Sequence, residues 1–173
     1  MSNDIDNNMH KQLEFERIND FFSKAKGVYS GLTINVLLTS QLIAPFVTFQ
    51  SLMYWILALI ICYIPRIVLT LLYFKAKKLQ KLTVDNIQYW ENKIFLNSIL
   101  PFFAFSSIVF LPFVGDVRLG FFVAALSLVT LLAGGVIIYS SSKKVAYLYL
   151  YISLGCLIAC CLYEATSHFY LLA

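Results

Sequence analysis

Charged residues are scarce in this sequence, and that scarcity decides the class of protein. They make up 13% of the 173 positions, whereas a soluble domain carries about 25%. Hydrophobic residues reach 60%, and the mean hydropathy is +0.78. These values exclude a soluble globular enzyme. They also exclude a disordered chain, which needs low hydrophobicity and high net charge.

Residue patterns that carry chemistry are also absent. There is no paired carboxylate, Ser/His/Asp set or H-E-x-x-H motif, and Glu164 with His168 provides too few ligands for a metal site. The basic residues lie between apolar runs and form no basic face for nucleic acid. We therefore expect no enzymatic activity, metal, cofactor or nucleic-acid partner. The four cysteines lie in apolar runs without C-x-x-C spacing, which indicates packing residues: Cys62, Cys156, Cys160 and Cys161.

Five apolar runs are long enough to cross a bilayer as helices, which takes about 20 residues. A membrane barrel would need alternating ten-residue segments, and these runs are apolar on every side. We therefore predict an all-α polytopic transmembrane helical bundle over residues 27–173, after a cytoplasmic amphipathic segment at 1–26. The predicted spans are 28–49, 53–74, 94–114, 119–139 and 145–163.

Basic residues alternate between the connections as they do in inner-membrane proteins. Eleven lysines and arginines fall in the N-terminal tail and in the second and fourth connections, whereas the opposite side holds only Arg118. Positively charged loops stay in the cytoplasm. The sequence therefore predicts a multi-pass protein of the cell inner membrane with a cytoplasmic N-terminus.

Two kinds of interfacial residue accompany the spans. Apolar residues at spacings of three and four predict an amphipathic helix on the inner leaflet or on a partner protein: Phe15, Ile18, Phe22 and Ala25. Aromatic pairs at the ends of spans are expected to anchor at the headgroup level: Tyr54, Trp55, Tyr89 and Trp90.

The sequence after Glu164 resembles a turn followed by the opening of another apolar run. Two interpretations follow: a truncated sixth helix, which the sequence favours, or a fifth helix that continues.

Polar residues inside spans are the candidates for ligand or signal sensing. Arg66 follows Pro65 within the second span, where a charge costs roughly 2.5–3.5 kcal/mol on insertion scales. The favoured interpretation is structural, with Arg66 either anchored at an inner interface or holding the bundle together. The remaining sensing candidates are Asn35, Gln41 and Asn97.

A stripe of small residues follows the fourth span, with a shorter one on the fifth. Such residues let helices approach closely, within one chain or across a homodimer. Packing within the chain is the favoured interpretation. The two stripes are Gly120, Ala124, Ser127, Thr130 and Gly134, and Gly155 with Ala159.

Several segments together resemble a known arrangement: Glu16–Phe22, Pro65-Arg66, Tyr89–Phe95 and Ala133–Ser142. They are similar to the multi-helix membrane input module that precedes diguanylate cyclase (GGDEF), phosphodiesterase (EAL) or histidine kinase domains in bacteria. The resemblance implies a dimeric sensor that signals to a cytoplasmic output domain or partner protein. Such modules usually have six helices, the sixth leading into an output domain that this chain lacks.

Two alternatives to the sensor remain open. The first is a structural or interaction protein, either a small subunit of a membrane complex or a secreted protein that inserts into a membrane. The second is a small transporter, which would be expected to show inverted repeats with broken helices. No internal similarity of that kind is visible.

Overall fold

The computed structural model describes the backbone of residues 2–139 and 141–170. Within these ranges, the side chains of 2–8, 10, 26, 85, 131, 133–139 and 163–170 lie outside the description. The described chain is helical, with one isolated bridge between Val47 and Phe113. Its α-helices are α1 (Ser2–Ser23), α2 (Ala25–Ile43), α3 (Phe49–Lys78), α4 (Ile87–Ser106), α5 (Val117–Tyr139) and α6 (Lys143–Tyr170). Its 3-10 helices are η1 (Ala44–Phe46), η2 (Val84–Asn86) and η3 (Ser107–Phe110).

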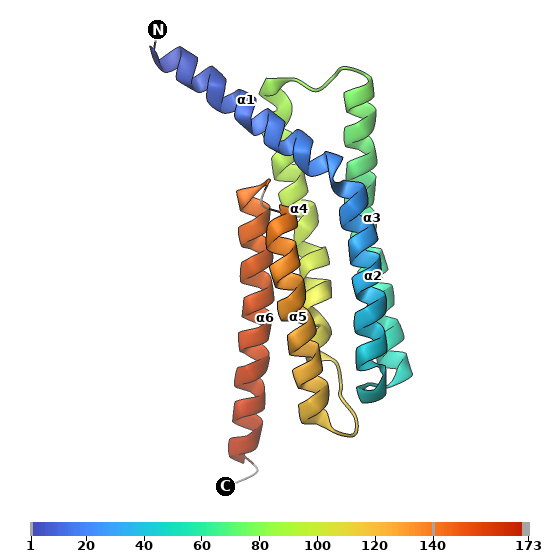
Figure 1. The fold of residues 1–173 in the computed structure, drawn as a ribbon. Helices are drawn as coiled ribbons and strands as arrows, with labels where there is room; N and C mark the ends of the chain where they lie inside the picture. The colour runs from blue at the N-terminus through green and yellow to red at the C-terminus, as the bar shows by residue number, and fades with distance from the viewer. Residues whose placement is uncertain (1, 140, 171–173) are drawn as a thin grey trace.

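Helices α2 to α6 run up and down as an antiparallel bundle, and α1 crosses one end of it (Figure 1). We call this the α1 end; the connection between α3 and α4 and the turn between α5 and α6 lie there too. The N-terminal part of α1 extends beyond the bundle. The opposite end, which we call the far end, holds the α2–α3 and α4–α5 connections.

Four helical segments are long and apolar enough to cross a membrane: Gly27–Phe46, Phe49–Lys78, Ile87–Phe110 and Lys143–Leu162. The predicted all-helical class and the membrane-compatible helices are therefore confirmed. Helix α5 has 23 residues, but among the residues whose side chains are described, its apolar part covers only Val117–Thr130. The number of spans accordingly belongs to the proposal below.

Helix boundaries differ from the predicted ones in three connections. The third span was predicted to end at 114, but α4 ends at Ser106 and η3 at Phe110. The first turn was predicted at 50–52, but α3 begins at Phe49. Pro45 lies in the short helix η1, and Thr48 caps α3 by accepting a hydrogen bond from the Ser51 amide at 3.3 Å. The long connection predicted at 75–93 shortens to 79–86, because α3 continues to Lys78 and α4 starts at Ile87.

Helix α6 runs without interruption from Lys143 to Tyr170. The predicted turn after Glu164 is therefore wrong, and the other interpretation, a continuing fifth helix, describes this segment. The sequence contains no glycine or proline between Glu164 and Tyr170 that would end a helix.

Two buried clusters fill the bundle, one near each end. The α1-end cluster consists of Ile18, Phe21, Phe22, Leu69, Tyr73, Ile87, Ile94, Phe102, Leu132, Val145, Tyr149 and Ile152. The far-end cluster consists of Ile43, Val47, Leu52, Trp55, Leu59, Tyr63, Phe105, Ile108, Val109, Ala124, Leu128 and Cys160. Helix α2 contributes little to either, since 11% of its apolar segment is buried against 44% for α4.

Candidate functional site

The C-terminal half of α1 docks on the bundle through aromatic side chains. Phe22 is 1% exposed, and its ring stacks on Tyr73 of α3 with the centroids 3.6 Å apart and the planes at 10°. Trp90 of α4 meets Tyr73 edge-on at 5.3 Å and Phe22 at 6.3 Å. The amphipathic segment expected on a membrane surface or a partner thus covers the end of its own bundle.

Arg66, which lies within the bundle on α3, also contacts α1. It lies 12 residues before the end of α3, about 18 Å along the helix axis. The side chain is 4% exposed, and its guanidinium carbon lies 5.8 Å from the Phe21 ring centroid and 5.5 Å from that of Phe102. Both distances suit cation–π attraction, which strengthens where water is excluded. We name the five residues Phe21, Phe22, Arg66, Tyr73 and Trp90 the docking cluster.

Hydrogen bonds at the Arg66 carbonyl connect α3 to α2. The Thr70 hydroxyl donates to the Arg66 carbonyl at 3.0 Å, and the Tyr29 hydroxyl lies 2.8 Å from Thr70 Oγ1. This chain of hydrogen bonds connects α2 with α3 one turn above Pro65, whose ring removes a backbone donor from α3. Three segments therefore meet around Arg66: α1 through Phe21, α2 through Tyr29, and α4 through Phe102.

The Tyr73 hydroxyl is buried and has no hydrogen-bond partner among the residues that the structure describes. An unmade hydrogen bond of this kind costs about 1–3 kcal/mol. The stacking of Phe22 on Tyr73 therefore has to offset the unfavourable free energy of the buried Tyr73 hydroxyl when α1 is docked.

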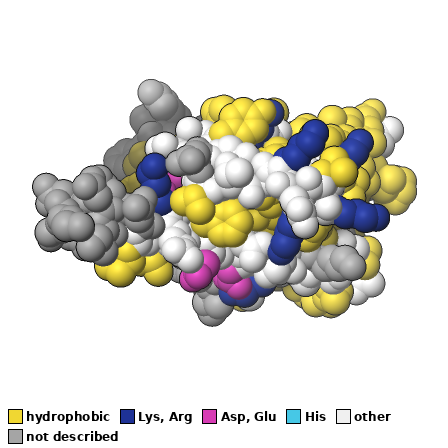
Figure 2. Space-filling view, turned by 90° about the horizontal axis from the view of Figure 1, so that it is seen from above, with side chains coloured by type: hydrophobic (Ala, Val, Ile, Leu, Met, Phe, Trp, Pro, Cys, Tyr) yellow, Lys and Arg dark blue, Asp and Glu magenta, His cyan; other side chains and the backbone are white. Residues whose placement is uncertain are grey.

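A polar rim surrounds the docking cluster. Asp20 of α1 accepts hydrogen bonds of 2.6 Å from Lys24 and from Ser141 in the α5–α6 turn, and these bonds lower the pKa of its carboxyl. Lys77 of α3 donates to Asn19 at 2.6 Å. Lysine and arginine side chains are spread over this face, with few acidic ones (Figure 2). The surface helix is thus tied to α3 and to the α5–α6 turn as well as to the aromatic cluster.

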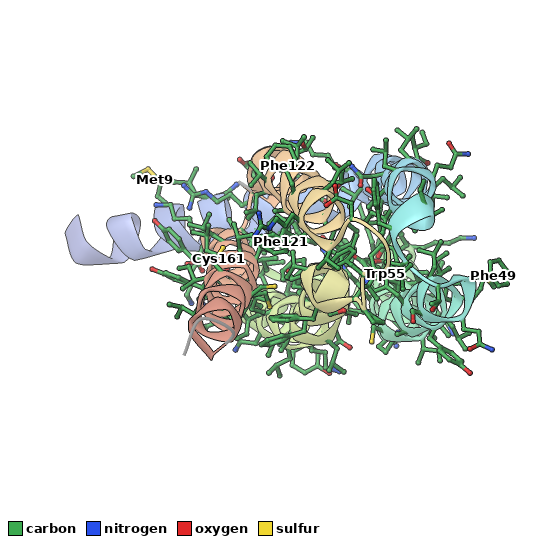
Figure 3. All side chains as sticks on the ribbon, turned by 90° about the horizontal axis from the view of Figure 1, so that it is seen from below. Met9, Phe49, Trp55, Phe121, Phe122 and Cys161 are labelled. Carbon is green, nitrogen blue, oxygen red and sulfur yellow. The ribbon has the colours of Figure 1, made fainter. Side chains whose placement is uncertain are left out.

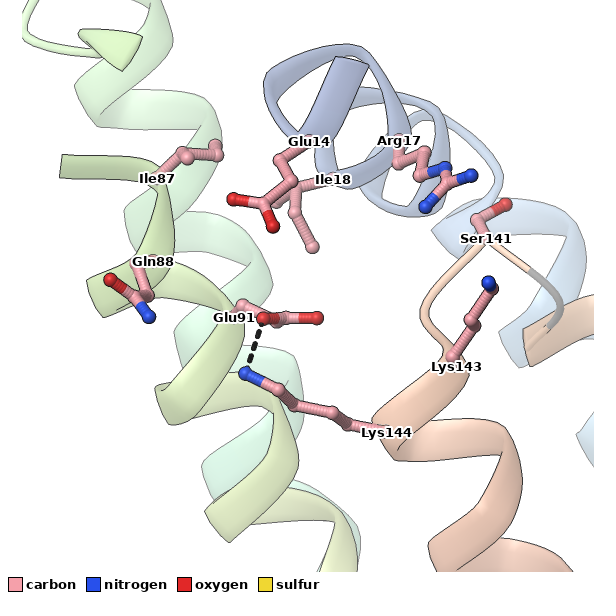
Figure 4. A pocket seen from close by; sticks show the side chains of 9 residues that line it. All are labelled: Glu14, Arg17, Ile18, Ile87, Gln88, Glu91, Ser141, Lys143 and Lys144. Atoms are coloured by element: carbon pink, nitrogen blue, oxygen red, sulfur yellow. Dashed lines mark hydrogen bonds and ion pairs between the residues drawn. The ribbon is translucent and has the colours of Figure 1, made fainter. Parts of the chain in front are cut away.

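A pocket of about 250 Å³ opens beside the rim, between α1, the first turns of α4 and the start of α6 (Figure 4). Within it Lys144 forms a 2.8 Å ion pair with Glu91, and Ser142 donates a long hydrogen bond of 3.4 Å to the same carboxylate. The residues that line it are Glu14, Arg17, Ile18, Ile87, Gln88, Glu91, Ser141, Lys143 and Lys144.

The predicted sensing residues do not gather around Arg66. Asn35 accepts a hydrogen bond from Thr39 within α2, and Asn97 donates to the Lys93 carbonyl within α4. Gln41 is exposed near the far end of α2. Each of the three therefore makes its contacts away from the docking cluster, among the residues that the structure describes.

The predicted packing residues divide into two groups. Gly120 and Ala124 are buried, whereas Ser127 and Thr130 return their hydroxyls to carbonyls of α5 itself. Gly155 and Ala159 are exposed, and a Cβ at Gly155 would have nothing within 4 Å. The expected packing of that pair against another helix of the chain is therefore wrong, and Gly134 lies outside the residues with described side chains.

The interface residues also differ from one another. Tyr54 and Tyr89 are exposed, as expected of anchors. Trp55 is 4% exposed, and its indole donates to the Ala104 carbonyl at 3.0 Å inside the far-end cluster, so its assignment as an interface anchor is wrong. Figure 3 shows it inside the bundle, with Phe49 at the rim. Trp90 is half-buried in the docking cluster.

Sequence reasoning missed Phe21, Tyr73 and Ser141. Phe21 and Tyr73 could have been found by asking which aromatic residues lie at the α1 end of their helices. Ser141 gave no signal, because its contact with Asp20 joins residues 121 positions apart.

No cluster of three or more His, Cys, Asp or Glu side chains occurs among the described residues. Comparison with protein-family models, curated proteins and solved structures found no match for this chain. The site therefore has to be interpreted from its own geometry, which couples a surface helix mechanically to the bundle.

Proposed function

We propose that this chain is a non-enzymatic sensory or regulatory module of the bacterial inner membrane. It crosses the membrane five times with α2 to α6 and keeps its N-terminus in the cytoplasm. Helix α1 passes the state of the bundle to a cytoplasmic signalling partner. The resemblance to the input modules of cyclases, phosphodiesterases and kinases agrees with this role.

One observation carries the proposal: α1 is held by side chains of several different bundle elements at once. Phe22 touches α3 and α4, Arg66 reaches Phe21 from inside α3, and Asp20 bonds the α5–α6 turn through Ser141. A shift of α3 relative to α4 would therefore change the surface on which α1 packs. Packed contacts of this kind switch between discrete arrangements, which is how a bundle can transmit a change.

The test is a distance measurement on the full chain in liposomes. Spin labels replace Met9 on α1 and Leu79 at the end of α3, both exposed, after the four native cysteines are replaced. We expect two distance populations whose ratio changes between thin and thick bilayers, and Phe22→Ala should favour the undocked one. A single distance that is the same in every bilayer would overturn the proposal.

The membrane orientation needs its own experiment. Reporter fusions at Asp85 and Ser142 should be cytoplasmic, and a fusion at Gly115 should not. A cytoplasmic reporter at Gly115 would contradict the five-span topology.

A second candidate function is a subunit of a larger membrane complex. One observation favours it: Gly155 and Ala159 line an apolar groove of about 770 Å³ between α3, α4 and α6, with Leu100 and Phe103 on its other wall. Small residues spaced four apart suit close approach of another helix. Co-purification of the intact chain in a defined complex, lost on Gly155→Leu, would support this function over the sensor.

A further inference from the structure

We propose that the pocket at the α1 end binds the phosphate group of an anionic phospholipid. The inference rests in part on the proposed function, because the lipid would bridge α1 to the bundle and so hold it docked. The binding site itself is argued from the pocket alone.

The first observation is the level at which the pocket lies relative to the membrane. Its walls include the first residues of α4, Ile87 and Gln88, and the first residues of α6, Lys143 and Lys144. Two membrane-compatible segments, Ile87–Phe110 and Lys143–Leu162, begin at this level. The pocket therefore lies where the hydrocarbon region gives way to headgroups, and Tyr89 is exposed at the same height.

The second observation is the charge inside the pocket. Three cationic side chains line it, Arg17, Lys143 and Lys144, against the two carboxylates Glu14 and Glu91. Lys144 is matched by Glu91 at 2.8 Å. Neither Arg17 nor Lys143 forms an ion pair with any side chain that the structure describes. Figure 4 shows both on the Ser141 side of the pocket.

These two cations come from elements far apart in sequence, α1 and the start of α6. An anion between them would accept charge-assisted hydrogen bonds from both. Arginine offers the planar fork that suits phosphate, and lysine adds a point charge. The Gln88 amide lines the pocket on the side opposite these cations (Figure 4), whereas the Ser141 hydroxyl already donates to Asp20.

Size and location together favour a lipid. A volume of about 250 Å³ lies just under the usual range for small-molecule sites, roughly 300–1,000 Å³. It therefore accommodates a phosphate ester and little more, and the acyl chains would lie along the apolar surface of the helices below. Anionic lipids are also attracted to basic residues near the membrane surface.

The experiment measures bound lipid directly on the full chain. The protein is reconstituted in nanodiscs of phosphatidylcholine with phosphatidylglycerol, and lipid retained after detergent release is counted by native mass spectrometry. We expect wild-type protein to retain phosphatidylglycerol over phosphatidylcholine. Arg17→Gln with Lys143→Gln should reduce this preference about 100-fold, since each charge-assisted hydrogen bond to the phosphate is worth about tenfold.

The matched control is Lys75→Gln with Lys78→Gln. It removes the same charge from exposed positions in the last turn of α3, outside the pocket. This control should keep most of the preference. Glu14→Gln, which removes a carboxylate from the pocket wall, should increase it, so the site is tested in both directions by variants at its surface.

Several results would overturn the assignment. Equal losses in the pocket variant and the control would mean diffuse surface charge, and no preference in wild-type protein would mean no site. Displacement of the lipid by millimolar glycerol phosphate would mean that the ligand is a soluble phosphate ester. If lipid binds but the Met9–Leu79 distances ignore it, the site stands and the proposed function fails; if the distances respond to bilayer thickness without lipid binding, the reverse holds.

Discussion

The two ends of the bundle are closed by different kinds of contact. At the far end, backbone groups meet directly: the Val114 amide donates to the Phe46 carbonyl at 2.6 Å, beside the Val47–Phe113 bridge. A Cβ on Gly120 would lie 2.8 Å from both Phe113 Cδ1 and Phe46 Cβ. At the α1 end, the contacts are between side chains: aromatic rings pack on one another, and exposed charged groups form ion pairs.

The difference indicates which end can open. Backbone contacts and a glycine without spare room favour a single packing arrangement at the far end, because close-packed interiors do not deform continuously. Side-chain contacts with a surface helix can be lost without breaking any helix of the bundle. Local opening of this kind occurs where stability is low. The α1 end is therefore the part of the bundle that can open, and the packing of the helices at the far end stays fixed.

The largest expected effect comes from removing one buried phenylalanine at each end. Phe22→Ala and Phe105→Ala should each cost about 3–5 kcal/mol, since both rings are almost fully buried. The chain has two tryptophans, Trp90 near Phe22 and Trp55 near Phe105, 5.9 Å apart in the latter pair. Fluorescence of single-tryptophan variants thus reports on each end separately.

We expect Phe22→Ala to shift only the Trp90 emission, because α1 leaves while the bundle stays closed. Phe105→Ala should lower the midpoint of unfolding for both tryptophans. If Phe22→Ala also unfolds the region around Trp55, the two ends are one cooperative unit and the comparison fails.

The next effect concerns the glycines. Gly120→Ala should destabilise the protein by about 1–3 kcal/mol, because the added methyl overpacks a site with no room. Gly155→Ala is the matched control: its Cβ meets nothing within 4 Å, and alanine favours the helix by roughly 0.8–1.0 kcal/mol. Denaturant unfolding in detergent micelles should rank them Gly155→Ala, wild type, Gly120→Ala. Equal stability of the two variants would contradict the rigid far end.

Tyr73→Phe should be neutral or stabilise α1 docking by up to about 1 kcal/mol. The change removes a buried hydroxyl that has no partner among the described residues and keeps the ring that stacks on Phe22. Trp90 emission during denaturant unfolding measures the effect, with Tyr73→Leu as the control that removes the stack. A loss of stability in Tyr73→Phe would show that the hydroxyl has a role in the docked state.

Much of this comparison was predictable and the rest was not. Run length predicted the helices, because a helix that crosses a bilayer needs about 20 apolar residues. The buried stripe of α1 followed from its spacing of three and four, as Ile18 and Phe22 show, whereas Ala25, predicted on the same helix, begins α2. What that stripe covers could not be predicted, since an apolar face specifies burial without naming its partner.

The site residues show the same limit. Arg66 was identified from its position, but its contacts with Phe21 and Phe102 depend on three helices coming together. Gly120 and Gly155 belong to similar small-residue stripes, yet only one of them is packed. Spacing fixes the face of a helix on which a residue lies, whereas the neighbour of that face is decided by tertiary packing.

The smallest expected effect is a pH dependence of α1 docking through Asp20. Hydrogen bonds from Lys24 and Ser141 lower the pKa of this carboxyl below its ordinary value of 3.8. A carboxyl whose pKa is lower in the docked state contributes stability above the ordinary value, and loses it as the pH falls through the lowered one. Docking, followed by Trp90 emission, should therefore weaken slightly below about pH 4. Asp20→Asn should lack this change while the far end, followed by Trp55, stays constant in both proteins; an identical acid response in Asp20→Asn would assign the effect to another group.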